Sequence, residues 1–126
     1  MFDQLKGMAG LAGLMKDLPR LKAKMEQVRA RLETIVVEAE TGGGAVRAQA
    51  NGQLRVTGLT VEPALMAGLV DATNADDRAM AEDLIVGAIN AALAKARDAA
   101  EAEMAGAMQE LGLPVPPGGL GGMLGA

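Results

Sequence analysis

The sequence predicts an α+β fold, because helical and strand-like patterns occupy separate stretches of the chain. Apolar residues recur at steps of three and four in residues 11–35 and 75–111, which is the period of an amphipathic helix. Between these stretches, apolar and polar residues alternate, and an Asn-Gly pair at residues 51–52 marks a hairpin. At 126 residues the chain is one domain long, so we expect a thin core unless a second copy shares it.

Residues 1–18 form an apolar, glycine-punctuated segment ahead of the main domain. Each of its three internal glycines weakens a helix by about 1 kcal/mol relative to alanine, so we expect this segment to fray when alone. Pro19 has no amide hydrogen, and it should therefore either kink a long helix or begin a new one. We assign residues 19–111 to a single dimerising α+β domain.

The first long helix carries an apolar seam and a basic stripe. The seam alternates steps of three and four, as in a helix that packs against another helix. Its members are Leu11, Leu14, Leu18, Leu21, Met25, Val28, Leu32 and Ile35. The stripe consists of Lys16, Arg20, Lys22, Lys24, Arg29 and Arg31. We expect the seam to bury against a helix and the stripe to face water or an anion.

Two strands and a tight turn should follow this helix. In residues 34–41 and 45–50, apolar side chains alternate with polar ones, so each strand is expected to have one buried face. The Asn51-Gly52 pair predicts a type I′ turn, in which both central residues have positive φ.

The third strand should contain an irregularity. Its apolar residues change phase at Gly58, which predicts a β-bulge that restores one buried face. Glu62-Pro63 ends the sheet, because proline cannot donate to the ladder.

A second long helix completes the domain. Residues 64–72 are expected to form a short helical turn, and Thr73-Asn74 then provides the N-cap of a helix that runs to Leu111. Gly112 is a natural helix stop. Residues 112–126 mix Pro, Gly and apolar residues without a period, so we expect a flexible tail.

Composition excludes most catalytic chemistry. The chain contains no His, Cys, Ser, Tyr or Trp, so the usual nucleophiles, imidazole bases and zinc or haem ligands are missing. A carboxylate site for magnesium or glycoside chemistry is an alternative for Asp76, Asp77, Glu82 and Asp83. Asp76 and Asp77 are better explained as first-turn residues, where negative charge meets the positive end of a helix dipole. We therefore predict a protein that is not an enzyme and that has no cofactor, no metal and no small-molecule substrate.

The same composition bears on the compartment. Without cysteine there is no disulfide framework, and the sequence shows neither a signal peptide nor an apolar run long enough to span a bilayer. We expect a cytoplasmic protein without a membrane partner.

The order of the motifs resembles that of the YbaB family of nucleoid-associated proteins. The matching pieces are Gly42-Gly43-Gly44-Ala45-Val46 before Asn51-Gly52, Val61-Glu62-Pro63, Glu82-Asp83-Leu84-Ile85 before Ala88-Ile89-Asn90-Ala91-Ala92, and Gly112-Leu113-Pro114 to Pro117-Gly118. The family more often has Asp where Glu62 stands. The resemblance implies an α-β-β-β-α fold with a three-stranded antiparallel sheet and two long helices. It also implies a tweezers-like homodimer in the nucleoid that binds double-stranded DNA with little or modest sequence preference.

The distribution of charge is compatible with DNA binding despite a net charge of −4. Residues 1–31 hold seven Lys and Arg against three Asp and Glu, so the excess negative charge lies in the rest of the chain. Phosphate contact needs only a local basic surface. We expect the stripe to contact DNA, with Arg47 and Arg55 on the strands as secondary contacts.

Two alternatives remain open. The cations of the stripe would also serve simply to solvate one face of a helix. The apolar N-terminal segment and the tail would suit an interaction adaptor that docks a protein partner without binding DNA. Soft apolar surface for such docking is offered by Met8, Met15, Met25, Met104, Met108 and Met123. Of these, Met25, Met104 and Met108 are better explained as part of a dimer core.

Overall fold

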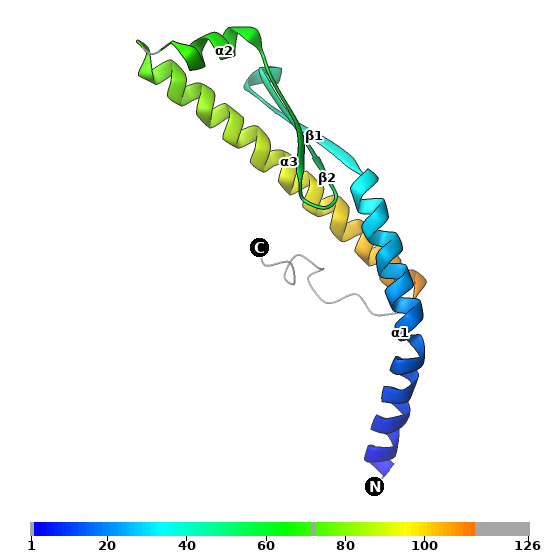
Figure 1. Ribbon diagram of the computed structural model, residues 1–126. Coiled ribbons are helices and arrows are strands. Elements are labelled where there is room, and N and C mark those ends of the chain that lie inside the picture. Colours follow the sequence, from blue (N-terminus) through cyan, green and yellow to red (C-terminus); the bar gives the residue numbers. More distant parts are fainter. Residues whose placement is uncertain (1, 72, 113–126) are drawn as a thin grey trace.

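The computed structural model describes residues 2–71 and 73–112, and within them the side chains from residue 15 onward. The elements are α1 (Phe2–Thr34), β1 (Val36–Thr41), η1 (Gly42–Gly44), β2 (Val46–Asn51), β3 (Val56–Val61), α2 (Pro63–Val70) and α3 (Ala75–Glu110) (Figure 1). The strands form one antiparallel sheet in the order β1-β2-β3. The α+β class and the α-β-β-β-α order are confirmed, with the expected short helical turn present as α2.

The core lies between α3 and the first two strands. Its fully buried side chains are Ala88, Ala92 and Ala96 of α3 and Val46, Ala48 and Ala50 of β2. Side chains this small let the helix approach the sheet closely, but they bury little apolar area. α3 contacts β1 and β2 extensively and β3 only slightly, so the third strand is poorly covered.

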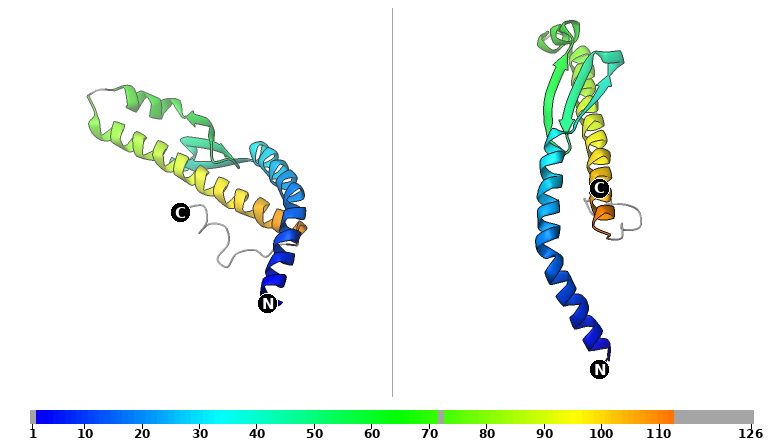
Figure 2. Two further views of the ribbon diagram at one scale, coloured as in Figure 1. Left: turned by 60° about the horizontal axis from the view of Figure 1, so that its bottom comes forward. Right: turned by 90° about the vertical axis from the view of Figure 1, so that its right-hand side faces the viewer.

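α1 is a single curved helix that continues through Pro19 (Figure 2). No new helix begins at Pro19, so that alternative is wrong. The C-terminal half of α1 runs antiparallel to the end of α3, and its N-terminal half extends beyond α3. Val28 is buried and Leu21 and Leu32 are half-buried. Leu21, Val28 and Leu32 therefore pack within the chain, whereas Leu18 and Met25 of the predicted seam remain exposed. The side chains of Leu11 and Leu14 lie outside the described ones.

The turn between β2 and β3 is not of type I′, so that prediction is wrong. The amide of Leu54 donates to the Asn51 carbonyl at 3.0 Å, which closes a turn with Gly52 and Gln53 at its centre. Gly52 does not have positive φ, whereas Leu54 does, at 63°. The glycine is needed for a different reason: a Cβ at position 52 would lie 2.7 Å from the carbonyl oxygen of Leu32. Asn51-Gly52 marked the hairpin correctly, but close packing against α1 decides its geometry.

The predicted bulge in β3 is confirmed. Gln49 pairs with Gly58 and Ala50 pairs with Val56, so β3 has one residue more than β2 at this point. The shift places Val56 and Leu59 opposite the buried alanines of β2. Their side chains therefore belong to the α3 side of the sheet.

Both ends of α3 follow the predicted chemistry. The Asn74 side chain accepts a hydrogen bond from the Asp77 amide at 3.2 Å, and Asp76 and Asp77 occupy the first turn. Gly112, with φ of 72°, follows the helix, and its amide donates to the Gln109 carbonyl. None of the helices within residues 2–71 and 73–112 is long and apolar enough to cross a membrane. Residues 113–126, which we expect to form the tail, lie outside the described residues.

Candidate nucleic-acid interface

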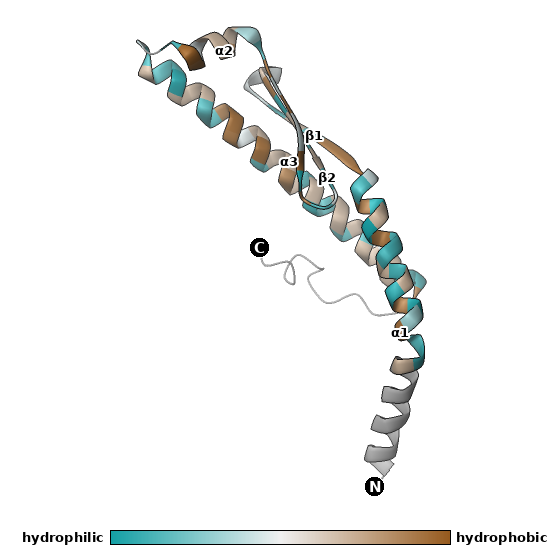
Figure 3. Ribbon diagram, in the orientation of Figure 1, coloured by the Kyte–Doolittle hydropathy of each residue, from teal (hydrophilic) through white to brown (hydrophobic). Residues whose placement is uncertain are grey.

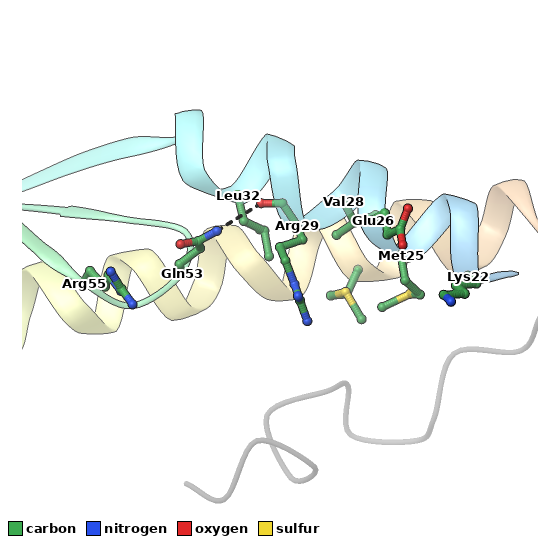
Figure 4. Close-up of a pocket in the computed structure, with 9 residues that line it drawn as sticks. Lys22, Met25, Glu26, Val28, Arg29, Leu32, Gln53 and Arg55 are labelled. Atoms are coloured by element: carbon green, nitrogen blue, oxygen red, sulfur yellow. Dashed lines mark hydrogen bonds between the residues drawn. The ribbon is translucent and has the colours of Figure 1, made fainter.

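A groove of about 620 Å³ opens between α1, the β2–β3 turn and α3 (Figure 4). It is lined by Lys22, Met25, Glu26, Val28, Arg29, Leu32, Gln53, Arg55 and Met104. Three of these side chains are cations and one is a carboxylate, so the groove has a net positive charge. Its other walls are largely apolar, and all three cations are exposed to solvent, so an incoming anion can reach them.

The three cations come from two elements whose backbones are tied together. Lys22 and Arg29 are seven residues apart on α1, so they share one face of the helix. The Gln53 side-chain amide donates to the Arg29 carbonyl at 3.3 Å, which ties the hairpin turn to α1. Asn51 Oδ1 accepts hydrogen bonds from the amides of Gln53, at 3.0 Å, and Arg55, at 3.2 Å. The backbone at Arg55 is therefore fixed beside α1.

Two further cations of the stripe face carboxylates on α3. Lys24 forms an ion pair with Glu110, and Arg31 lies 3.5 Å from Glu103. The hydrogen bond from Lys24, together with its charge, lowers the pKa of the Glu110 carboxyl. A lowered carboxyl pKa means that the pair is intact at neutral pH and is lost as pH falls through that pKa.

The remaining candidate cations are spread over the surface. Lys16 and Arg20 are exposed on α1 and belong to none of the ion pairs formed among the described side chains. Arg47 lies on the outer face of the sheet, 3.3 Å from Glu40 of β1. Of the eight predicted residues, the structure thus gathers Lys22, Arg29 and Arg55 around one groove and places Arg47 elsewhere.

The sequence analysis did not identify the carboxylates that pair with Lys24 and Arg31. Glu103 and Glu110 are seven residues apart, as are Lys24 and Arg31, and this matched spacing in two antiparallel helices could have revealed the pairs. Gln53 carried no comparable signal, because its bond to Arg29 depends on how the turn meets α1.

An apolar surface beside the groove is left open by the part of the chain that the structure describes. Val56 and Leu59 of β3 are 43% and 47% exposed, although both lie on the core side of the sheet. Val86 of α3 is 55% exposed, and Ile89 and Leu93 are partly buried at the edge of the core. We call these five residues the β3 shelf. The hydropathy colouring shows brown, apolar bands in α3 that alternate with paler turns (Figure 3).

The opposite flank of α3 is closed by polar contacts to β1. Lys95 Nζ donates to the Glu38 carbonyl at 2.8 Å, and the Thr41 hydroxyl donates to the Leu84 carbonyl at 2.6 Å. At 100° per residue, Val86 lies about half a turn from this flank. Polar contacts thus join α3 to β1 on one side. On its β3 side, the described residues leave Val86 exposed.

The fold and the groove define a small α+β protein with a cationic surface beside an uncovered apolar shelf. The profile of the YbaB/EbfC DNA-binding family matches residues 8–111, and the chain belongs to this family of DNA-binding proteins. The family resemblance inferred from the order of the motifs is thereby confirmed.

Two relatives support the same assignment. A nucleoid-associated protein of Anaeromyxobacter dehalogenans is 42% identical over 101 residues, which cover 80% of this chain and 91% of the relative. One of Rhodopseudomonas palustris is 40% identical over 117 residues, covering 90% and 100%. Among solved structures, an uncharacterized protein from Helicobacter pylori matches with a TM-score of 0.49 and 20% identity, over 64% of this chain and 86% of that one.

Proposed function

We propose that the protein binds double-stranded DNA as a homodimer in the cytoplasmic nucleoid, where it organises DNA and affects gene expression. The observation that carries this proposal is the convergence of Lys22, Arg29 and Arg55 on one groove. A cation placed against a phosphate releases condensed counterions, which favours binding without any reading of sequence. Membership of a DNA-binding family and the nucleoid-associated names of the relatives support it.

The chemistry of the groove favours phosphate over bases. Sequence is read by side chains that match donors and acceptors on base edges, of which Asn and Gln are typical examples. Apart from its cations, which can bind guanine as well as phosphate, the groove offers only Gln53, whose amide is already bonded to the Arg29 carbonyl. Phe2 is the one aromatic residue of the chain, so base stacking has little support. We expect binding with little sequence preference.

The other candidate cations take secondary roles in this proposal. Lys16 and Arg20 extend the positive surface along α1. Lys24, Arg31 and Arg47 each have a carboxylate partner in the free protein, so each must exchange that partner before it contacts phosphate.

The homodimer is proposed to form through the β3 shelf. Val28 and Val46 are the largest fully buried side chains among the described residues, so this part of the chain buries little apolar surface on its own. The shelf places apolar residues on the core side of a sheet where none of the elements within residues 2–71 and 73–112 covers Val56, Leu59 and Val86. A second copy related by a two-fold axis would cover both shelves with one self-complementary contact and would present two grooves.

The proposed DNA site is tested by changing Lys22 and Arg29 to Ala together. The loss of each phosphate contact should weaken duplex binding by roughly tenfold at 0.1 M salt, as measured by fluorescence anisotropy. The matched control changes Arg78 and Lys95 of α3 to Gln, which removes the same charge away from the groove and keeps an amide donor at position 95, where Lys95 donates to the Glu38 carbonyl. Equal affinities for the two double variants would contradict the proposed site.

An adaptor role without DNA binding is the second candidate. It is favoured by the exposure of Met15 and Leu18, which are 64% and 52% exposed on the half of α1 that extends beyond α3. Anisotropy of a labelled duplex with the wild-type protein at low salt distinguishes the two candidate functions. An adaptor that does not bind DNA would leave the anisotropy unchanged.

A further inference from the structure

The tip of the β2–β3 hairpin contains a leucine in an unfavourable backbone conformation. Leu54 has φ of 63° and is the only non-glycine residue with positive φ within residues 2–71 and 73–112. In this region the Cβ of an L-residue approaches its own carbonyl oxygen, whereas glycine adopts the conformation freely. Strain of this kind persists only where the surrounding structure enforces it, and it is often found at functional sites.

The turn around Leu54 is rigid. The Leu54 amide donates to the Asn51 carbonyl at 3.0 Å, and the Asn51 amide donates to the Arg55 carbonyl at 2.9 Å. Asn51 is only 7% exposed, and its side-chain oxygen accepts two further amide hydrogen bonds within the same turn. The hairpin therefore holds residue 54 in a fixed position.

Leu54 is apolar, accessible and next to cations. It is 39% exposed, and its two neighbours in the chain, Gln53 and Arg55, both line the cationic groove. Arg29 faces the same groove from α1. A duplex held by these cations would lie against the hairpin tip.

We propose that Leu54 is a wedge that enters the minor groove of bound DNA and pushes between two base pairs, so that the duplex bends. Proteins that bend DNA through the minor groove use apolar side chains in this way, flanked by cations that hold the backbone. A rigid turn suits the task, because the wedge must resist the restacking of the bases. This inference rests on the proposed DNA binding. It adds that Leu54 contacts the minor groove and that the bound duplex is bent.

The experiment measures energy transfer between dyes on the two ends of a short duplex, together with anisotropy on the same samples. Wild type should raise the transfer efficiency on binding. Leu54→Gly should bind with an unchanged dependence on salt and a several-fold lower affinity, without the rise in transfer. Leu54→Met, which keeps an apolar side chain, should retain most of the bending. Thermal unfolding and light scattering confirm that both variants are folded and assembled as wild type is.

The possible failures are distinct. If wild type binds the duplex without a rise in transfer, or if Leu54→Gly bends it as wild type does, the wedge is overturned and the proposed DNA binding stands. If Leu54→Gly changes the molecular mass in light scattering, Leu54 is an assembly contact and the wedge is likewise overturned. If wild type shows no anisotropy change at low salt, the proposed function itself fails.

Discussion

Lys24 and Arg31 show how single side chains set the charge that this surface offers to DNA. Each is a cation of the α1 stripe, and each is held by a carboxylate of α3. An exposed ion pair of this kind contributes little to stability, because water and salt screen it. Its larger effect is to hold part of the positive charge back from an incoming phosphate.

We predict that Glu110→Gln raises the affinity for duplex DNA. The substitution frees Lys24, so the salt dependence of binding should steepen by about one contact per subunit, and affinity at low salt should rise several-fold. Glu82→Gln is the matched control, since Glu82 is exposed on α3 and belongs to none of the ion pairs between the described residues. Equal gains from the two variants would mean that net charge alone, and not the release of Lys24, governs the affinity.

At the scale of elements, the junction of α1 with the hairpin depends on Gly52. The Gly52 amide donates to the Leu32 carbonyl at 2.8 Å, so the turn lies directly against the end of the helix. This contact brings Arg55 of the hairpin to the same groove as the cations of α1.

Gly52→Ala should therefore destabilise the protein. The added Cβ would lie 2.7 Å from the Leu32 carbonyl oxygen, and overpacking of this kind costs about 1–3 kcal/mol. Chemical denaturation measures the change. Gly106→Ala serves as the comparison, because nothing lies within 4 Å of its Cβ and alanine favours a helix, so its stability should rise by up to about 1 kcal/mol. A Gly52→Ala protein as stable as wild type would contradict the packing described here.

The elements were predictable because each depends on local chemistry. Alternation placed Val46, Ala48 and Ala50 on the buried face, and Asn74 marked the start of α3. The type I′ turn was wrong because the hairpin meets α1, which is a contact between distant parts of the chain. Pro19 failed to start a helix because a helix can continue through a proline at the cost of bending.

The candidate site was only partly predictable. The sequence identified six of the cations by their place on one helix and proposed Arg47 and Arg55 on the strands as secondary contacts. It did not indicate which of them share a groove, because this depends on how α1 and the hairpin pack. Nor did it indicate which cations are ion-paired, because the carboxylates come from α3, more than 70 residues later in the chain.

At the scale of the whole molecule, the β3 shelf should mediate self-association. Leu59→Asp places a charge within the shelf, where burial against a second copy would remove it from water. We expect light scattering to report a dimer for wild type and a monomer for this variant. Thr60→Asp is the matched control, because Thr60 is exposed on the other face of the same strand. If Leu59→Asp remains a dimer, the β3 shelf is not part of the dimer interface.

A dimer with two cationic grooves should bind DNA with an affinity that falls steeply as the salt concentration rises. Lys22, Arg29 and Arg55 from both subunits would neutralise six phosphates in total if every cation makes one contact. The most direct measurement is a titration of duplex affinity against salt for the wild-type protein. We predict a slope of about −5 in a plot of log affinity against log salt concentration. A slope near zero would show that phosphate contacts do not hold the complex together and would contradict the account.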